Sequence, residues 1–186
     1  MAKLRSIGVF CGSAAGAKPD YVDGAKAAGR AVAQAGARLV YGGGDVGLMG
    51  AAAQAALDED GPVLGIIPEF IIKHEGLLEK AETRIVTTMS TRKNMLINES
   101  DAFLILPGGV GTLEEIFDVL SRNRLGLQQK PVAFLNVDGF WDPMFTLLHR
   151  TEEEGFTPAG FAGEILIDTD PDDAVAHLMS ALEGKE

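Results

Sequence analysis

Short apolar runs alternate with longer amphipathic segments along most of this 186-residue chain. We expect the apolar runs to be strands, with the ranges Ser6–Cys11, Arg38–Tyr41, Val63–Ile67, Thr83–Val86, Asp101–Leu106, Val132–Leu135 and Glu164–Ile167. Most of these runs are apolar at every position, which is typical of parallel strands whose two faces are both covered. The alternation therefore predicts right-handed βαβ units and an α/β fold, in which helices cover both faces of a doubly wound parallel sheet.

The segments between these runs have the apolar spacing of helices. Their ranges are Tyr21–Ala35, Leu48–Asp58, Thr91–Glu99, Leu113–Arg124, Phe140–Glu153 and Pro171–Leu182. The stretch Pro68–Glu82 is the one long connection, and we expect it to act as a lid or an interface. Since the chain contains no internal repeat and no linker, we expect residues 1–186 to form one domain with a sizeable core.

The composition excludes several classes of protein. A net charge of −11 and a pI of about 4.7 argue against non-specific binding to nucleic acid or to a membrane. If the protein binds an anionic ligand, the basic side chains that bind it must be concentrated at the site itself. The apolar runs are too short to span a membrane and the start of the chain lacks a signal layout, which predicts a cytoplasmic location. The lone Cys11 and the three histidines lack disulfide or metal-ligand spacing, so we expect no metal.

A glycine loop follows the apolar run that ends at Leu106. Residues 107–115 read PGGVGTLEE, which is a strand leading through glycines into a helix. Such a loop turns backbone N–H groups toward an anion, and the helix N-terminus adds a favourable partial charge. The loop also places a carboxylate, Glu115, within about one helical turn of that site. The sequence therefore predicts a phosphate site with a built-in acid or base, as chemistry on a phosphorylated sugar requires.

Glu115 has a second interpretation. The segment Thr112-Leu-Glu-Glu115 fits the S/T-x-x-E capping box, in which the glutamate only satisfies the Thr112 N–H. Glu114 would then be a first-turn acid that is favourable to the helix dipole. One carboxylate can serve both roles in different states, so both interpretations stay open.

A second glycine loop, Gly42–Gly50, contains G-x-G-x-x-G at residues 42–47, with Glu69 at about the distance that a dinucleotide fingerprint requires. Its alternatives are a tight turn that packs a helix on a strand, and part of a phosphoribosyl pocket. The presence of two glycine loops favours the pocket. The residues that we expect in it from this region are Gly43, Gly44, Gly47 and Ser13.

Two cations follow the strand that ends at Val86. We expect Ser90 to cap the next helix, which places Arg92 and Lys93 in its first turn, where the helix dipole disfavours positive charge. A bound anion would compensate for this. The alternative is a solvated pair that faces acidic residues of the surface.

Four segments together resemble the LONELY GUY (LOG) family of cytokinin-activating nucleoside 5′-monophosphate phosphoribohydrolases, which are often mislabelled lysine decarboxylases. The segments are Cys11-Gly-Ser, Tyr41–Gly50, Met89-x-x-Arg92-Lys93 and Pro107–Glu115. The similarity extends from about Ile7 to Glu154 and includes Lys130-Pro131-Val132 and residues 135–139. The resemblance implies a Rossmann-like fold, no metal or other cofactor, and a homodimer.

The resemblance also implies that Arg92 and Glu115 are the catalytic pair. The residues that would hold the nucleotide are Glu75, Lys93, Gly108, Gly109, Val110, Gly111, Thr112, Leu113, Glu114 and Ser121. The chain departs from the family at Ser121-Arg122-Asn123-Arg124, which lacks the Thr-Trp that many relatives carry there. This departure affects the shape of the base pocket and so the preferred N6 group.

The function predicted on this basis is hydrolysis of the N-glycosidic bond of adenosine 5′-monophosphate, N6-modified or plain, to the free base (a cytokinin) and ribose 5-phosphate. Glu115 would stabilise the sugar cation or activate water, and Arg92 would orient the sugar phosphate and hold Glu115 ionised. An alternative is a nucleotide or molybdenum-cofactor carrier on the same fold, which would not need Glu115. An NAD-dependent oxidoreductase lacks a second domain here, and a PLP-dependent decarboxylase needs a Schiff-base lysine and usually a larger chain.

Overall fold

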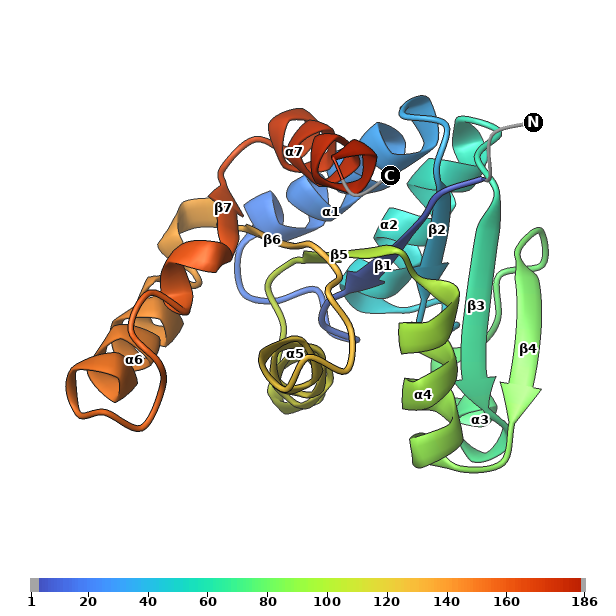
Figure 1. Ribbon diagram of the computed structural model, residues 1–186. Helices are drawn as coiled ribbons and strands as arrows, with labels where there is room; N and C mark the ends of the chain where they lie inside the picture. The colour runs from blue at the N-terminus through green and yellow to red at the C-terminus, as the bar shows by residue number, and fades with distance from the viewer. Residues whose placement is uncertain (1–3, 185–186) are drawn as a thin grey trace.

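The computed structural model describes residues 4–184, and a seven-stranded sheet forms its centre (Figure 1). The strands are β1 (Ser6–Phe10), β2 (Arg38–Tyr41), β3 (Val63–Pro68), β4 (Glu82–Val86), β5 (Ala102–Ile105), β6 (Val132–Leu135) and β7 (Leu166–Asp168). Their order is β4-β3-β2-β1-β5-β6-β7, and every neighbouring pair is parallel. The predicted parallel α/β fold is therefore confirmed.

The strand order reverses at the centre of the sheet. The chain runs outward from β1 through β2 and β3 to β4, then returns to place β5 on the other side of β1. The loops after β1 and β5 therefore leave in opposite directions and open a crevice at the carboxyl ends of these strands. Gly12 N–H still bonds to the Pro107 carbonyl at 3.0 Å across this point, so the two loops remain in contact at their bases.

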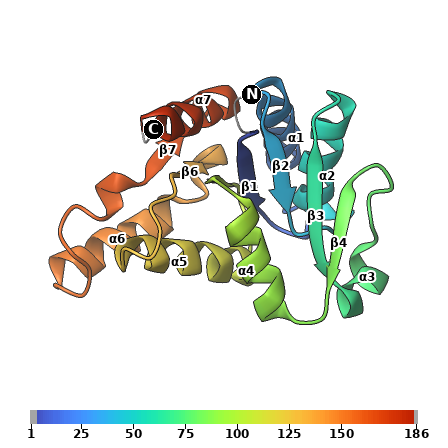
Figure 2. The same ribbon diagram turned by 45° about the vertical axis from the view of Figure 1, so that its right-hand side comes forward.

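Helices cover both faces of the sheet. One face carries α1 (Pro19–Gln34), α2 (Gly47–Asp58) and α7 (Pro171–Glu183), and the other carries α4 (Met89–Glu99), α5 (Val110–Arg124) and α6 (Asp142–Glu153). Figure 2 shows α4, α5 and α6 along one side of the sheet, with α1 and α7 on the opposite side. All residues of β1, β3, β5 and β6 are buried, as their continuous apolar character predicts. Within residues 4–184, no helix has the length and apolar character needed to cross a membrane.

Several element ends differ from the prediction. The long connection contains a short helix, α3 (Glu69–Glu75). The start of the last predicted strand forms a 3₁₀ turn at Ala162–Glu164, and β7 begins only at Leu166. The helix expected from Phe140 begins at Asp142, because a separate 3₁₀ turn, Val137–Gly139, precedes it. These shifts are one to three residues, as is usual where turns merge into regular elements.

One predicted helix cap was wrong, and so was one of the two interpretations left open for Glu115. The N-cap of α4 is Thr88 rather than Ser90, and its hydroxyl accepts the Thr91 N–H at 3.1 Å, so Arg92 lies just past the first turn. The N-cap of α5 is Gly109, which makes Thr112 the third helical residue. The capping-box interpretation of Glu115 is therefore wrong, because Thr112 does not stand at a helix start.

The α1–α2 contact requires a glycine in α1. A Cβ atom on Gly29 would lie 2.0 Å from the backbone oxygen of Ala52 in α2. We predict that Gly29→Ala lowers the free energy of unfolding by about 1–3 kcal/mol, because the two helices must move apart. Urea denaturation measures this change. Gly163→Ala is the control, since a Cβ there meets nothing within 4 Å; equal stabilities of the two variants would contradict the prediction.

Candidate active site

A cavity of about 330 Å³ opens at the crevice between the loops after β1 and β5. Its lining comes from these two loops and from α2, α3, α4 and the first turns of α5. The lining residues are Cys11, Gly12, Ser13, Met49, Ile71, Glu75, Met89, Arg92, Gly109, Val110, Gly111, Thr112 and Glu115. The structure thus brings both predicted catalytic residues, Arg92 and Glu115, to one cavity.

Arg92 is the most buried charged side chain of this cavity, with only 7% of its surface exposed. Its Nε donates to the carbonyl of Ile66 at 3.1 Å, and its Nη2 donates to the carbonyl of Gly42 at 2.8 Å. These bonds anchor the guanidinium to the residue after β2 and to the second half of β3, and they satisfy two of its N–H groups. Within residues 4–184 its Nη1 makes no hydrogen bond, which leaves that side of the fork for a ligand.

Glu115 projects from the second turn of α5 into the same cavity. Burial raises its pKa from 4.5 to about 7, and the negative charges of Glu114 and Glu75 act in the same direction. The positive charges of Arg92 and Lys93 oppose that rise in pKa. Glu115 therefore changes its charge near neutral pH, which is the range in which a carboxyl group can act as an acid or as a base.

The N-terminus of α5 forms another part of the wall. The N–H groups of Val110, Gly111 and Thr112 precede the first intrahelical bond, which runs from Leu113 N–H to the Gly109 carbonyl at 3.0 Å. Gly109 has no side chain to cap these donors, so they are available to an anion. The predicted phosphate site thus adjoins Glu115, about one helical turn away.

The polar lining also includes Glu75, Cys11 and the hydroxyl side chains of Ser13 and Thr112. The Oε2 atom of Glu75 is buried and, among the described residues, has no hydrogen-bond partner. Cys11 is buried, and this burial together with the nearby charge of Glu115 raises the pKa of its thiol, so the thiol is neutral. The polar side chains of the cavity are therefore one guanidinium, two carboxyl groups, two hydroxyls and one uncharged thiol. Among residues 4–184, no group of three or more histidine, cysteine or acidic side chains is arranged to hold a metal ion.

Other predicted site residues lie outside the cavity lining. Lys93 contacts Glu114 and pairs with Asp118 at 3.4 Å, so it connects α4 to α5. One alternative left open for the pair Arg92 and Lys93 was that both cations face acidic residues of the surface. This holds for Lys93, whereas Arg92 lines the cavity. The remaining predicted residues that do not line the cavity are Gly43, Gly44, Gly47, Gly108, Leu113, Glu114 and Ser121.

The cavity also contains residues to which the sequence analysis gave no site role, although Met49 and Met89 lie in its quoted motifs. Met49, Ile71 and Met89 supply its apolar surface. Ile71 lies in the segment expected to be a lid or an interface, which was the one available signal for it. The carbonyls of Ile66 and Gly42 carried no signal, because every residue has a carbonyl and only the fold decides which ones meet Arg92.

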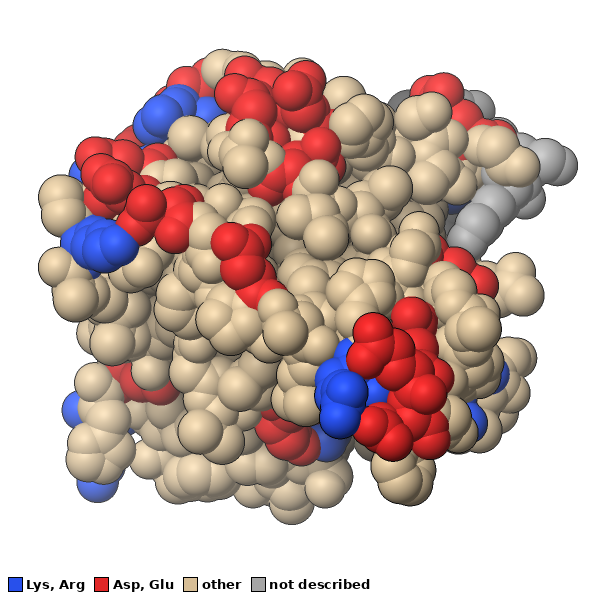
Figure 3. Space-filling model, turned by 90° about the vertical axis from the view of Figure 1, so that its left-hand side faces the viewer, with Lys and Arg blue, Asp and Glu red and all other residues tan. Residues whose placement is uncertain are grey.

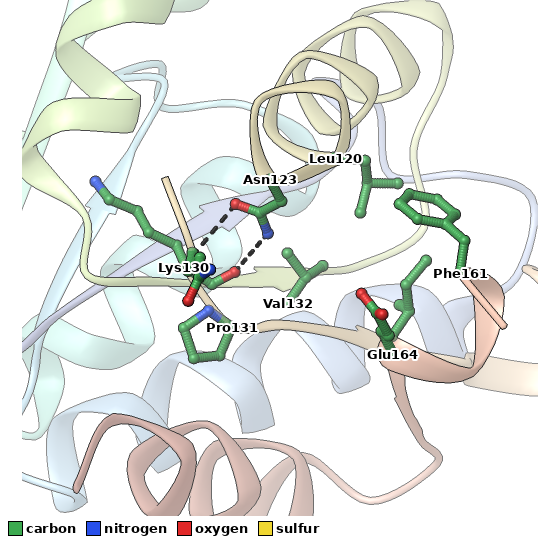
Figure 4. A pocket seen from close by; sticks show the side chains of 9 residues that line it. Leu120, Asn123, Lys130, Pro131, Val132, Phe161 and Glu164 are labelled. Carbon is green, nitrogen blue, oxygen red and sulfur yellow. Dashed lines mark hydrogen bonds between the residues drawn. The ribbon is translucent and has the colours of Figure 1, made fainter. Parts of the chain in front are cut away.

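A second cavity, of about 350 Å³, lies at the amino end of β6 between α5 and the 3₁₀ turn before β7 (Figure 4). The Asn123 amide donates to the Lys130 carbonyl at 2.8 Å and accepts the Lys130 N–H at 3.2 Å, as the dashed lines in Figure 4 show. The Lys130 ammonium in turn donates to the carbonyls of Ile97 and Ser100 at the end of α4. This cavity holds none of the predicted site residues, but its polar bonds fix the helix that carries Arg92.

The surface charge supports a local anion site. Figure 3 shows acidic side chains in several clusters on the face that carries α6, with few basic side chains and a broad uncharged area between them. On a chain of net charge −11, an anionic ligand gains little from the overall field. The attraction must come from Arg92 and from the N–H groups at the start of α5.

Residues 49–178 match a family model described as "Possible lysine decarboxylase". The chain is 40% identical over 181 residues to the cytokinin riboside 5′-monophosphate phosphoribohydrolase of Rhodococcoides fascians, covering 95% of this chain and 90% of that protein. It is 44% identical over 155 residues to LOG3 of Arabidopsis thaliana, which has the same descriptive name (83% and 72% covered). It is 43% identical over 155 residues to LOG of Oryza sativa subsp. japonica, again with that name (83% and 64% covered).

Solved structures with the same fold include molybdenum-cofactor proteins. The molybdenum cofactor binding protein from Rippkaea orientalis superposes with a TM-score of 0.74 at 25% identity, covering 98% of this chain and 99% of that one. The molybdenum cofactor carrier protein from Chlamydomonas reinhardtii gives a TM-score of 0.75 at 21% identity, with the same coverage. The second likeness shows the shared fold alone.

The buried charge of Glu115 gives a test that needs no substrate. The raised pKa means that the protonated form stabilises the fold below about pH 4.5 and that this stabilisation is lost as pH rises through about 7. Glu115→Gln removes the charge, so we predict that its gain in stability over the parent protein is small at pH 5 and rises to the order of 2 kcal/mol at pH 8. Thermal unfolding at both pH values measures this. The exposed Glu153→Gln is the control, and a gain that does not depend on pH would contradict the prediction.

Proposed function

Because the chain belongs to the LOG family of cytokinin riboside 5′-monophosphate phosphoribohydrolases, we propose that it cleaves the N-glycosidic bond of adenosine 5′-monophosphates, N6-modified or plain. The products are the free base, a cytokinin where N6 is modified, and ribose 5-phosphate. The observation that carries this proposal is the meeting of Arg92, Glu115 and the N-terminus of α5 at one cavity. These groups match the sugar, the developing charge and the phosphate of such a substrate.

The proposed reaction adds water across the bond between C1′ and the base. As the C1′–N bond breaks, its electron pair leaves with the base and positive charge builds on the ribose ring. The ionised carboxylate of Glu115 stabilises that charge or removes a proton from the attacking water, whose oxygen becomes bonded to C1′. The base takes up a proton as it leaves, which balances the reaction.

Arg92 and the start of α5 position the substrate in this proposal. The N–H groups of residues 110–112 bind the 5′-phosphate, and the free side of the Arg92 guanidinium binds the phosphate or the sugar hydroxyls. The positive charge of Arg92 also lowers the pKa of Glu115 and so increases its ionised fraction near neutral pH. Glu75, whose buried Oε2 has no hydrogen-bond partner within residues 4–184, is a further substrate contact.

The description "lysine decarboxylase" finds no support in the cavity. A PLP enzyme needs a lysine that reaches its cofactor as a Schiff base. None of the lining residues is a lysine, and the nearby Lys93 pairs with Glu114 and Asp118. The molybdenum-cofactor carriers of similar fold provide the other candidate function, binding without turnover, and the assay below separates the two. We also propose a cytoplasmic location, which the single free thiol of Cys11 supports.

We predict that AMP and N6-modified AMP release free base and ribose 5-phosphate, whereas adenosine reacts at least about 10²-fold more slowly, because binding energy from the remote phosphate is lost from the transition state. Glu115→Gln should lower kcat by roughly 10²-fold or more and keep AMP affinity, since the N–H groups of α5 are unchanged. Chromatography of the released bases measures the rates, and titration calorimetry measures the affinity for AMP. Equal rates on adenosine and AMP, or AMP binding without any base release, would overturn the proposal.

We propose that a second copy of the chain covers the cavity mouth. Apolar residues follow one side of α5 and the loop after it: Val110 is 83% exposed and Leu127 73%, and Phe117 and Leu125 are also exposed. Val110 lines the cavity as well, so this apolar surface is continuous with the site. Exposed apolar surface next to a ligand site is typical of a protein interface.

The expected mass in light scattering is therefore about twice the 19.6 kDa of the chain. Phe117→Glu should shift the protein to monomer, because it places a charge at the centre of the apolar surface. Ile85→Glu on β4 is the matched control, since Ile85 is comparably exposed at the far edge of the sheet. A parent protein that is a fully active monomer would refute the dimer.

A further inference from the structure

The guanidinium of Arg92 occupies the space that a side chain at residue 42 would need. Its Nη2 bonds to the Gly42 carbonyl at 2.8 Å, and a Cβ atom on Gly42 would lie 2.2 Å from that same nitrogen. The distance from this Cβ to the Arg92 Cζ would be 3.3 Å. Any residue other than glycine at position 42 would therefore displace Arg92 from its two carbonyl partners.

Gly44 has the same relation to Glu75. A Cβ atom on Gly44 would lie 2.7 Å from the Glu75 Oε2 and 2.9 Å from the Glu75 Cβ. The backbone of the neighbouring Asp45 holds this region together, because its N–H bonds to the Glu75 carbonyl at 2.6 Å. The turn after β2 thus packs against one basic and one acidic side chain of the cavity.

Conformational freedom does not explain these two glycines. Gly43 and Gly47 have φ angles of 86° and 59°, which favour glycine, but Gly42 and Gly44 are not among the positive-φ residues. Close approach of backbone to ligand does not explain them either, since neither residue lines the cavity. The feature that requires glycine at 42 and 44 is the space taken by Arg92 and Glu75.

We propose that Gly42 and Gly44 are positioning residues, whose missing side chains let the turn after β2 seat Arg92 and Glu75 at the cavity wall. The G-x-G of this turn therefore acts on the substrate through two side chains and does not cradle a phosphate. The activity tests of this inference rest on the proposed function, whereas its stability test does not.

The central experiment is a double-mutant cycle between Gly42→Ala and Arg92→Ala. Gly42→Ala alone should lower kcat/KM for AMP about 10²-fold, because a displacement of about 1 Å at a catalytic group costs that much. In the Arg92→Ala background, adding Gly42→Ala should change kcat/KM less than about twofold, since the group it displaces is already gone. Losses that multiply in the double variant would overturn the proposal. Gly163→Ala should keep the parent kcat/KM.

The pH profile supplies a readout that a merely structural role would not move. Burial and the charges of Glu114 and Glu75 raise the pKa of Glu115, and those of Arg92 and Lys93 lower it. Displacing the Arg92 guanidinium removes part of the lowering, so the acidic limb of kcat/KM should move to higher pH in Gly42→Ala. A reduced rate with an unchanged profile would overturn the role assigned to Gly42.

Thermal unfolding separates this inference from the proposed function. Truncating Arg92 creates room for the new methyl group, so Arg92→Ala/Gly42→Ala should unfold within about 2 °C of Arg92→Ala even where Gly42→Ala alone is unstable. For Gly44 the matching background is Glu75→Gly, because an alanine at residue 75 would keep the Cβ that lies 2.9 Å from the new methyl group. Glu75→Gly/Gly44→Ala should match Glu75→Gly in the same way. A double variant that is clearly less stable than the single variant at residue 92 or 75 would overturn the inference. It would show that the new methyl group clashes elsewhere, for example with Met49. This result is obtained whether or not the parent protein hydrolyses AMP.

Discussion

A buried guanidinium bonded to two backbone carbonyls holds this site together. Arg92 extends from α4 under the carboxyl edge of the sheet and bonds to Gly42, which follows β2, and to Ile66, in the second half of β3. A buried charge is costly unless it is hydrogen-bonded, so these two bonds are a condition for placing the arginine there at all. The glycine turn, the register of β2 on β3 and the cap of α4 all determine where that charge lies.

The positive charge of Arg92 also offsets the negative charge of the carboxyl groups in the cavity. Glu115 and Glu75 share a small cavity, and two buried anions repel each other. Burial raises the pKa of Glu115 to about 7, and the positive charge of Arg92 opposes this rise as it offsets part of the repulsion. The site is therefore close to a change of charge at neutral pH, and the arrival of a phosphate dianion must alter the balance further.

The sequence predicted the parts of the structure that follow from local pattern. Continuous apolar runs located the strands, and β2 and β6 match their predicted ranges at both ends. The motif at residues 107–115 located the cavity, because a glycine loop after a central strand lies at the carboxyl edge of the sheet, where such sheets bind their ligands. The helix starts were less predictable: Thr88 and Ser90 are both good caps, and only the path of the chain from β4 decides between them.

The parts that could not be predicted depend on contacts between distant segments. Arg92 and Lys93 are neighbours with similar chemistry, yet one binds carbonyls 26 and 50 residues away and the other pairs with acidic residues of α5. Likewise, the glycine turn resembled a dinucleotide fingerprint, and only the fold shows that Gly42 and Gly44 face protein side chains. The spacing of glycines in a sequence does not show which atoms occupy the space where a side chain would lie.

The walls of the cavity differ in how firmly they are attached. Helices α4 and α5 each bury several residues, and α4 is capped by Thr88 at its start and by Lys130 at its end. The seven-residue α3, which supplies Ile71 and Glu75, buries none of its residues. Local opening costs the least free energy where little apolar surface is buried. Amide hydrogens of α3 should therefore exchange with solvent through small local fluctuations, whereas those in the centre of α4 should exchange only through larger openings. The cavity thus combines a rigid wall that carries the arginine with a wall that can move aside for a ligand of nucleotide size.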